Sequence, residues 1–544
     1  MSASTSTPPS AAVIPGAAPA PAALPFRDGT PEQYRALREY MRAVSYTYEE
    51  IYRRGRRRPD VGKGEGAADP ERGAPEDAAE LLILLYFDGL AVKWTAVRAG
   101  IDPHALALLE ELGLLQSLAS APEFAVGTVL LYPIASVYVA SDHPYLVAGT
   151  AGAMPDFVFA AMSWNTQEYM TLLPSAPCDA FAEMCGGTGV AALEAARTAR
   201  RSVTLDITER ATRFAEFNAR FNGIENVTAL QGDLYEPVRG QTFDRIAAHP
   251  PYVPAFHQEL IFRDGGADGE QITRRIVEGL PEHLRPGGRL YCVCQATDRV
   301  DAPLERRLRT MLGAAESEFD VLVVELSKPT NPTEFYARQA WHRDGSGFAE
   351  VEARHKAFKA MGVTRLVYSL FVLQRREGPR PVFTARREAG RTRSAQVEWI
   401  LAWETLRASG LDGRDVLDRP LAVQPWVQVD VQLRPRDGQF HPVGTGVRSE
   451  LPSRFDASCP PWMGAFLTKC DGRATARELL ASLREVRMVP PDASEEVFAS
   501  LVADLVGAGV LAAEGLPTPP AYDPPLWARD DDATAGAGSE PGGA

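Results

Sequence analysis

The chain has 544 residues and a formal net charge of −14, and 45% of its residues are hydrophobic and 24% charged. At about 150 residues per domain, this length predicts roughly three or four domains, and the composition is that of a globular protein with a sizeable core. The acidic balance excludes a nucleic-acid-binding polycation and leaves only local basic patches for such contacts.

No sequence feature directs the chain into a membrane or through one. The alanine- and proline-rich start lacks the positive and apolar regions of a signal peptide. No run reaches the roughly 18 apolar residues of a membrane helix. None of the six cysteines forms a zinc-type pair, and Cys292 and Cys294 share one face of a predicted buried strand. We expect a cytoplasmic protein with no metal site and no disulfide framework.

Composition and periodicity divide the chain into five parts. We predict a disordered tail (1–25), an N-terminal winged-helix-like module (26–145), a central domain (146–376), a C-terminal helix-plus-hairpin module (377–515) and a second disordered tail (516–544). The two flanking modules are therefore expected to be small and of mixed α+β structure. Winged helices contact nucleic acid or dock proteins and substrates, and the pattern leaves both roles open.

The N-terminal module begins with an expected helix whose N-cap is Thr30, followed by Pro31. Two strand-like runs later in the module are expected to join near Pro133. Between the helix and these runs lies a charged insert, which is either a solvated loop or a phosphate-binding patch. Its arginines are Arg53, Arg54, Arg56, Arg57 and Arg58.

The central domain alternates strands and helices from residue 180 to 254, which indicates a parallel sheet covered on both faces. The fold class is therefore α/β and Rossmann-like. Further along, FDVLVVEL and RLVYSLFVLQRR predict an antiparallel pair of strands at the sheet edge, with a long helical insertion between them.

A glycine-rich turn follows the first strand of this unit and precedes a helix. Glycines let the backbone approach a ligand closely, and a helix N-terminus favours electron-rich groups. One such turn is weak support on its own, because many turns look similar. Its candidate cofactor-binding residues are Glu183, Cys185, Gly186, Gly187 and Gly189.

Two further acids strengthen this interpretation, because they follow the next two strands. Asp206 is placed to accept the hydroxyls of a ribose, and Asp233 lies within reach of an adenine edge. The lysine-containing phosphate loop GxxxxGK[ST] is absent, and Glu183 would repel phosphate but suits an ammonium group. A ligand with an ammonium, a ribose, an adenine and no phosphate is S-adenosyl-L-methionine.

Residues 180–300 resemble a class I S-adenosylmethionine-dependent methyltransferase. More narrowly, they resemble the small-domain group that includes release-factor glutamine methyltransferases and nucleic-acid amino-methyltransferases. The resemblance implies a seven-stranded core in which the first acid and the glycines hold the methionine end of the cofactor. It likewise implies that Asp206 holds the ribose and that Asp233 lies near the adenine. Cys185 stands where the family has its first glycine, with Gly186 beside it.

The family's Asn/Asp-Pro-Pro-Tyr/Phe loop is here His249, Pro250, Pro251 and Tyr252, which we take as the catalytic candidates. Two prolines fix the backbone and leave carbonyls to hold the acceptor nitrogen, while Tyr252 can stack on a planar substrate. His249 replaces the family's Asn or Asp, and a neutral histidine offers one acceptor and one donor. It could also accept a proton from the substrate.

We therefore expect a methyltransferase acting on a nitrogen, a glutamine-like amide or an amino group, of a protein or peptide. Three alternatives stay open. The first is an RNA or DNA amino-methyltransferase that grips phosphates with the arginine insert. The second is a small-molecule natural-product methyltransferase with His249 as a base. The third is a non-catalytic binding scaffold.

Overall fold

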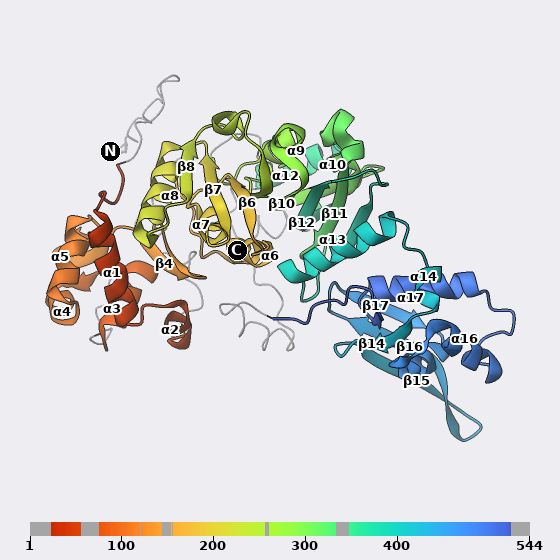
Figure 1. Cartoon of the computed structure of the whole chain (residues 1–544). Helices are drawn as coiled ribbons and strands as arrows, with labels where there is room; N and C mark the ends of the chain where they lie inside the picture. The colour runs from red at the N-terminus through yellow and green to blue at the C-terminus, as the bar shows by residue number, and fades with distance from the viewer. Residues whose placement is uncertain are drawn as a thin grey trace, which may run out of the picture.

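The computed structural model describes residues 23–55, 75–119, 121–143, 154, 156–255, 260–332 and 348–523. An eight-stranded sheet lies at its centre, between the N-terminal helices and the C-terminal module (Figure 1). From one edge to the other its strands are β13 (Thr384–Glu388), β11 (Phe319–Glu325), β12 (Val363–Arg375), β10 (Leu284–Arg299), β9 (Phe243–Ala248), β6 (Cys178–Met184), β7 (Ala199–Asp206) and β8 (Val227–Gln231).

The sheet changes direction of winding at β6. The chain runs outward from β6 through β7 to β8, and then returns to the other side of β6 to form β9, and all of these neighbours pair in parallel. Strand β10 continues in parallel from β9, whereas β12 is antiparallel to both β10 and β11. Ligands bind beyond the carboxyl ends of the strands at such a switch point, so the ends of β6 and β9 are where a site is expected.

Two hydrophobic clusters cover the two faces of the sheet. Consecutive residues of a strand point to opposite faces, so Phe181 belongs to one cluster and Ala182 to the other. The Phe181 face packs against α6 (Trp164–Leu172), α7 (Val190–Ala195), α8 (Glu209–Asn222) and α13 (Ser394–Ala408). The Ala182 face packs against α9 (Gln271–His283) and α10 (Leu304–Leu312). This arrangement confirms the Rossmann-like α/β class.

Three details of the sheet differ from expectation or extend it. The β11 and β12 strands pair antiparallel as predicted, but β12 lies inside the sheet and not at its edge. An eighth strand, β13, pairs in parallel with β11 beyond residue 376, in a segment expected to belong to the C-terminal module. The predicted helical insertion contains α12 (Phe348–Ala360), and residues 334–347 of it lie outside the described residues.

The N-terminal module combines helices with a small sheet. Its helices are α1 (Pro31–Ala43), α2 (Tyr48–Arg53), α3 (Ala78–Leu82), η1 (Ile83–Phe87), α4 (Trp94–Gly100) and α5 (Pro103–Glu111). Its strands β1 (Val92–Lys93), β3 (Ala121–Gly127) and β2 (Leu115–Leu118) form one sheet in that order. Thr30 caps α1 with a reciprocal capping box, as its position predicts. The winged-helix assignment itself stays a prediction.

The last hairpin of this region, β4 (Leu130–Ile134) with β5 (Val137–Ser141), is attached to the central domain. The two strands join near Pro133, as predicted: the turn contains Ala135, which has a φ of 50°, and Pro133 itself pairs with Tyr138 inside the hairpin. Asn218 of α8 accepts a hydrogen bond from the Ala140 amide at 2.7 Å and donates to the Ala140 carbonyl at 3.0 Å. The amide of this side chain thereby acts as an extra residue of the strand ladder.

The C-terminal module contains two three-stranded sheets and three longer helices. Its elements are α14 (Arg414–Leu417), β14 (Pro420–Val423), β15 (Gln428–Arg436), β16 (Gln439–Ser449), β17 (Phe455–Cys459), α15 (Trp462–Lys469), β18 (Asp471–Thr475), α16 (Ala476–Glu485), α17 (Glu495–Gly507) and β19 (Leu511–Ala513). The sheets have the orders β18-β14-β19 and β15-β16-β17, and the second includes the predicted hairpin.

The chain after this module runs back along α13. Trp399 donates to the Pro517 carbonyl at 3.0 Å, and the guanidinium groups of Arg391 and Arg393 lie 5.6 and 5.7 Å from the Tyr522 ring centroid. The prediction of a disordered tail from residue 516 is therefore wrong for residues 516–523. Residues 524–544 lie outside the described residues. Among the described residues, no helix is long and apolar enough to cross a membrane.

We expect Asn218→Ala to lower the free energy of unfolding by about 1–3 kcal/mol, because it leaves buried amide and carbonyl groups of Ala140 without partners. The measurement is denaturant-induced unfolding, with the exposed Glu225→Ala on the loop after α8 as the control. Equal midpoints for Asn218→Ala and the wild type would show that the hairpin does not depend on this side chain.

Candidate functional site

The glycine-rich turn lies directly beyond β6 and turns sharply into α7. Cys185, Gly187 and Gly189 all have positive φ angles, of 55°, 54° and 76°. Cys185 thus takes the left-handed conformation that the family's glycine would take, at a cost of order 1–3 kcal/mol. Gly186 does not substitute for it, because Gly186 instead lies so close to β7 that an added Cβ would be 1.9 Å from the Thr204 hydroxyl.

Glu183 is buried at the end of β6 and is directed at the first turn of α7. Its two carboxylate oxygens accept hydrogen bonds from the backbone amides of Ala191 and Ala192, at 3.2 and 3.0 Å. Burial raises the pKa of this carboxyl to about 7, although the two amides act in the opposite direction. The carboxylate therefore fixes the helix start that follows the glycine turn. Its predicted contact with the cofactor stays a prediction.

Asp206 ends β7 and reaches across to the same turn. One carboxylate oxygen accepts from the Gly187 amide at 2.9 Å, and the other accepts from the amide and hydroxyl of Thr208 at 3.0 and 3.1 Å. Burial raises the pKa of Asp206, against the effect of these hydrogen bonds. The structure thus brings together the first two predicted cofactor-binding groups, the glycine turn and the ribose-binding acid.

Asp233 follows β8 and forms an ion pair with Arg275 of α9 at 2.8 Å. Burial raises the pKa of the Cys185 thiol, and the nearby carboxylates of Asp206 and Asp233 raise it further. All three predicted acids therefore lie around one turn at the carboxyl edge of the sheet. Unlike Asp206, Asp233 already has a cationic partner.

The His-Pro-Pro-Tyr loop follows β9, the strand next to β6. Met184 and Ala248 are paired in register, so Cys185 and His249 are the first residues beyond the two strands. The His249 ring lies between Tyr169 of α6, with centroids 5.4 Å apart, and Tyr252, with centroids 5.8 Å apart and planes 24° apart. The predicted catalytic loop and the predicted cofactor turn are therefore neighbours.

His249 is neutral in this environment. Burial lowers its pKa to about 4, and its Nε2 atom is buried without a hydrogen-bond partner among the described residues. The hydroxyl of Tyr169 is buried and unpartnered in the same way. Buried polar atoms in native proteins are normally satisfied, so these two atoms leave hydrogen-bonding capacity unused beside the loop.

Sequence reasoning missed several residues around the loop. Asn165 of α6 donates to the Tyr252 hydroxyl at 3.3 Å. Tyr368 of β12 lies 6.1 Å from the Tyr252 ring and 5.3 Å from the ring of Trp164. Nothing in the local sequence marks these positions, because α6 falls in a segment expected only to connect domains and Tyr368 reads as an ordinary strand residue.

The loop is braced from behind by the segment that leads into α9. The Gly265 amide donates to the Val253 carbonyl at 2.8 Å. A Cβ on Gly269 would lie 2.4 Å from the Tyr252 carbonyl, so this position accepts only glycine. The segment ends at Glu270, which is 1% exposed and accepts from the amide and hydroxyl of Thr297 at 3.0 and 2.8 Å.

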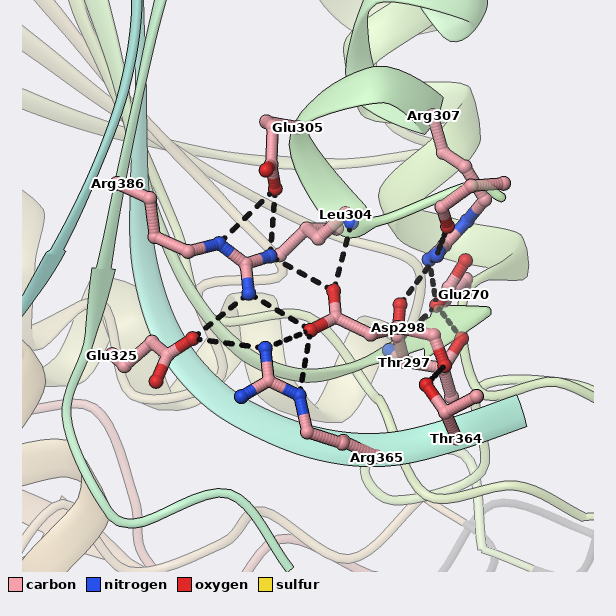
Figure 2. A network of polar contacts seen from close by, with 11 residues as sticks. Glu270, Thr297, Asp298, Leu304, Glu305, Arg307, Glu325, Thr364, Arg365 and Arg386 are labelled. Atoms are coloured by element: carbon pink, nitrogen blue, oxygen red, sulfur yellow. Dashed lines mark hydrogen bonds and ion pairs between the residues drawn. The ribbon is translucent and has the colours of Figure 1, made fainter. Parts of the chain in front are cut away.

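Glu270 belongs to a larger network of ion pairs at the end of β10 (Figure 2). It also pairs with Arg307 of α10. Nearby, Asp298 accepts from the guanidinium groups of Arg365 and Arg386, and Arg386 also contacts Glu325 at 2.8 Å. Because Asp298 lies next to Thr297, the network connects the segment that braces the loop to β10, β12 and β13.

A separate groove of about 470 Å³ lies along β13 and α13 and contains none of the predicted site residues.

The strand order is that of a class I methyltransferase fold, and the two neighbouring loops lie at its switch point. Residues 160–323, in the centre of the chain, match the family model described as the methyltransferase small domain. The match includes the glycine turn, all three acids and the His-Pro-Pro-Tyr loop.

Named relatives agree with this assignment. The match to a ribosomal protein uL3 glutamine methyltransferase of Bradyrhizobium diazoefficiens is 32% identical over 26% of this chain and 48% of that protein. The match to a release factor glutamine methyltransferase of Moorella thermoacetica is 36% identical over 21% of this chain and 46% of that protein. The chain thus spans about half the length of these relatives. A solved ribosomal protein L11 methylase from Lactobacillus delbrueckii subsp. bulgaricus aligns over 39% of this chain and 80% of that chain at 16% identity, with a TM-score of 0.23.

We expect Asp206→Ala to weaken S-adenosylmethionine binding by roughly 10- to 150-fold, the equivalent of about 1.5–3 kcal/mol for a charged hydrogen-bonded contact. The measurement is a calorimetric dissociation constant. Asp179→Ala, a 65% exposed aspartate near the opposite end of β6, is the control and leaves affinity unchanged. An unchanged affinity for Asp206→Ala would refute its role in holding the ribose.

Because the pKa of His249 is about 4 in the folded chain and about 6.5 in the unfolded chain, only the unfolded chain binds this proton between those values. The proton bound by His249 in the unfolded chain therefore lowers the free energy of unfolding as pH falls from about 6.5 to 4. We expect His249→Asn to make the unfolding free energy fall less steeply over this window in denaturant titrations. Parallel curves for the variant and the wild type would contradict a buried neutral imidazole.

Proposed function

We propose that the protein is an S-adenosylmethionine-dependent methyltransferase that acts on a nitrogen of a protein or peptide. The observation that supports this best is the convergence of two loops at one switch point. The glycine turn and Asp206 form one side, and His249 with Tyr252 form the other. The relatives whose names specify glutamine methylation of a ribosomal protein and a release factor support a protein substrate.

The residues present fit this cofactor. A Cβ on Gly187 would meet nothing within 4 Å, so the backbone there leaves open space beside the amide that Asp206 holds. Among the described residues, neither Glu183 nor Asp206 forms an ion pair with a side chain, and burial raises the pKa of both carboxyls. A cationic ligand complements such a pair of carboxyls, whereas a phosphate would be repelled.

When bound, S-adenosylmethionine supplies a methyl group on a positively charged sulfur. The protein's part is to position the acceptor nitrogen so that its lone pair faces that methyl group, which can supply much of the rate. Tyr252 is held by the Asn165 hydrogen bond and by ring contacts with His249 and Tyr368. His249 offers a neutral ring nitrogen to the acceptor group.

The open alternatives have less support. Arg53 and Arg54, the described members of the arginine insert, pair with Glu50 and Asp77, and the remaining three lie outside the described residues. The two described arginines of the insert therefore already have acidic partners. The named relatives favour neither a small-molecule acceptor nor a scaffold.

We assign the enzyme to the cytoplasm, in keeping with six cysteines that are all free thiols.

The direct test is incubation of the protein with radiolabelled S-adenosylmethionine and a cell extract, followed by separation of protein, nucleic acid and small molecules. Label in the protein fraction, lost in Asp206→Ala, is the expected result. Label confined to nucleic acid or to small molecules would overturn the assignment of a protein acceptor. Absence of cofactor binding would overturn the enzyme assignment itself.

We expect Tyr252→Ala to lower kcat/KM for the labelled protein substrate by roughly 10- to 100-fold, because the acceptor loses its stacking surface. Initial rates are measured with substrate below saturation. Phe440→Ala, which removes a 70% exposed ring from the C-terminal hairpin, leaves the rate unchanged. An unchanged rate for Tyr252→Ala would show that this ring does not contact the acceptor.

A further inference from the structure

Strand β13 forms one edge of the eight-stranded sheet, and only one of its two sides pairs with another strand of that sheet. It runs parallel to β11 in a register without shifts. The Phe383 carbonyl accepts from the Val321 amide at 3.1 Å, and the Ala389 amide donates to the Glu325 carbonyl at 2.8 Å. Because the bonding direction alternates along a strand, the odd-numbered residues of β13 bond to β11. The even-numbered residues turn their amides and carbonyls outward.

The outward side of β13 already makes one backbone hydrogen bond of the kind that pairs strands. The Glu388 carbonyl accepts from the Arg454 amide at 2.7 Å, just before the chain enters β17. The Arg386 carbonyl accepts from the Arg387 side chain at 3.0 Å. No hydrogen bond joins the amides of Thr384 and Arg386, or the Thr384 carbonyl, to another described residue. These backbone groups stay open to an extended chain that pairs with the edge.

The groove of about 470 Å³ lies beside this open edge. Its lining consists of the segment from Pro381 to Arg387, which includes most of β13, and of Glu404, Arg407 and Ala408 in the last turns of α13. Consecutive side chains of a strand point to opposite faces of a sheet, so a chain paired at the edge directs every second side chain to the α13 side. The groove provides room for those side chains.

The arginines of β13 do not guard the open edge. Exposed edges are commonly protected by outward charges, by prolines or by bulges. Arg386 instead lies in the ion-pair network on the α10 side of the sheet, where it contacts three carboxylates (Figure 2). Arg387 pairs with Glu404 of α13. The strand itself contains neither a proline nor a register shift, so the usual devices that keep another chain away are missing here.

The charges of the groove favour an acidic ligand. Three arginines and one glutamate line it: Arg386, Arg387, Arg407 and Glu404. Arg407 pairs with Asp504 at 3.0 Å in a contact whose two side chains are 44% and 66% exposed. An ion pair as exposed as this contributes little to stability, so Arg407 can exchange Asp504 for a carboxylate that a ligand brings. Complementary charge of this kind selects a partner.

Resting on the proposed function for the identity of the partner, we propose that the outer edge of β13 and its groove dock an extended, acidic segment of the protein substrate. The segment pairs with β13 as a further strand of the sheet, and one of its carboxylates contacts Arg407. Strands β11, β12 and β10 separate β13 from β9, so the docked strand lies five strand spacings, roughly 24 Å, from β9. Docking there therefore acts on the affinity for the substrate and not on the methyl transfer itself.

A second copy of this chain fits the edge less well. Two copies of β13 paired antiparallel in full overlap place their Arg386 side chains opposite each other, and like charges in that position destabilise pairing. The Thr384 amide of the copy also needs the Glu388 carbonyl, which the Arg454 amide already occupies.

The test measures the fluorescence polarisation of two labelled peptides on the full-length protein, one of alternating valine and glutamate and one of alternating valine and lysine. We expect roughly 10-fold tighter binding of the glutamate peptide. Thr384→Pro removes an outward amide of β13 and is expected to weaken that binding by roughly 10-fold. The matched control is Thr384→Val, which also loses the hydroxyl that Arg309 contacts at 2.7 Å but keeps the amide.

Arg407→Ala tests the charge without a change in the backbone of β13. It is expected to remove the preference for the glutamate peptide, and Arg434→Ala on the exposed strand β15 is the control. Absence of binding, equal binding of the two peptides, or binding unaffected by Thr384→Pro and Arg407→Ala overturns the proposal. A concentration-dependent dimer that Thr384→Pro abolishes overturns it too, because the occupant of the edge is then a second copy.

Methyl transfer to the protein fraction of a cell extract shows whether the docked segment belongs to the substrate. The glutamate peptide is expected to raise the apparent KM and to leave kcat unchanged, with no effect on Thr384→Pro. Peptide binding without this competition overturns the assignment to the substrate. The binding measurements need no methyl transfer, so a failure of docking leaves the proposed function standing as long as label reaches protein and depends on Asp206. The two failures are therefore distinguishable.

Discussion

The parallel pairing of β6 with both β7 and β9 is the constraint on which the rest of the site depends. Met184 is in register with Leu205 on one side and with Ala248 on the other. The next residue on each strand is therefore Cys185, Asp206 or His249. A single register thus places the glycine turn, the acid predicted to bind a ribose and the first residue of the His-Pro-Pro-Tyr loop side by side.

Burial at this point decides which charges the site can hold. Desolvation disfavours the charged form of every group, so it raises the pKa of Glu183 and Asp206 and lowers that of His249. The carboxyls are kept in place by backbone amides of the glycine turn and α7, and not by arginine or lysine side chains. These charges support the proposal of a ligand that brings its own positive charge.

The sequence predicts the residues that directly follow the strands, but not the residues that reach the site from distant elements. The glycine turn, Asp206, Asp233 and the His-Pro-Pro-Tyr loop could be predicted because each directly follows a strand with a clear pattern. Trp164 and Tyr368 could not, since they reach the loop only through the packing of α6 and the antiparallel insertion of β12 between β10 and β11.

Other differences have similar causes. The strands join near Pro133, but the proline itself lies inside the hairpin, because in a two-stranded hairpin it can occupy a position where no ladder donor is needed. The eighth strand β13 is short and rich in charge, with arginines at positions 386 and 387, so its sequence has little of the apolar pattern of a buried strand. Its place in the sheet follows instead from long-range ion pairs, in which Arg386 joins Asp298, Glu305 and Glu325.

That network connects the edge of the sheet to the segment that supports the His-Pro-Pro-Tyr loop. Glu270 closes the segment that braces Tyr252 and simultaneously bonds Thr297 on β10, beside Asp298. An ion pair with one deeply buried member is costly to break, because the remaining charge is left without a partner. The acceptor loop is thus held from behind by a fixed framework while its ring-bearing side stays unsatisfied. In the methyltransferase that we propose, a loop fixed in this way needs no rearrangement when substrate arrives, which is the condition under which positioning lowers the barrier to methyl transfer.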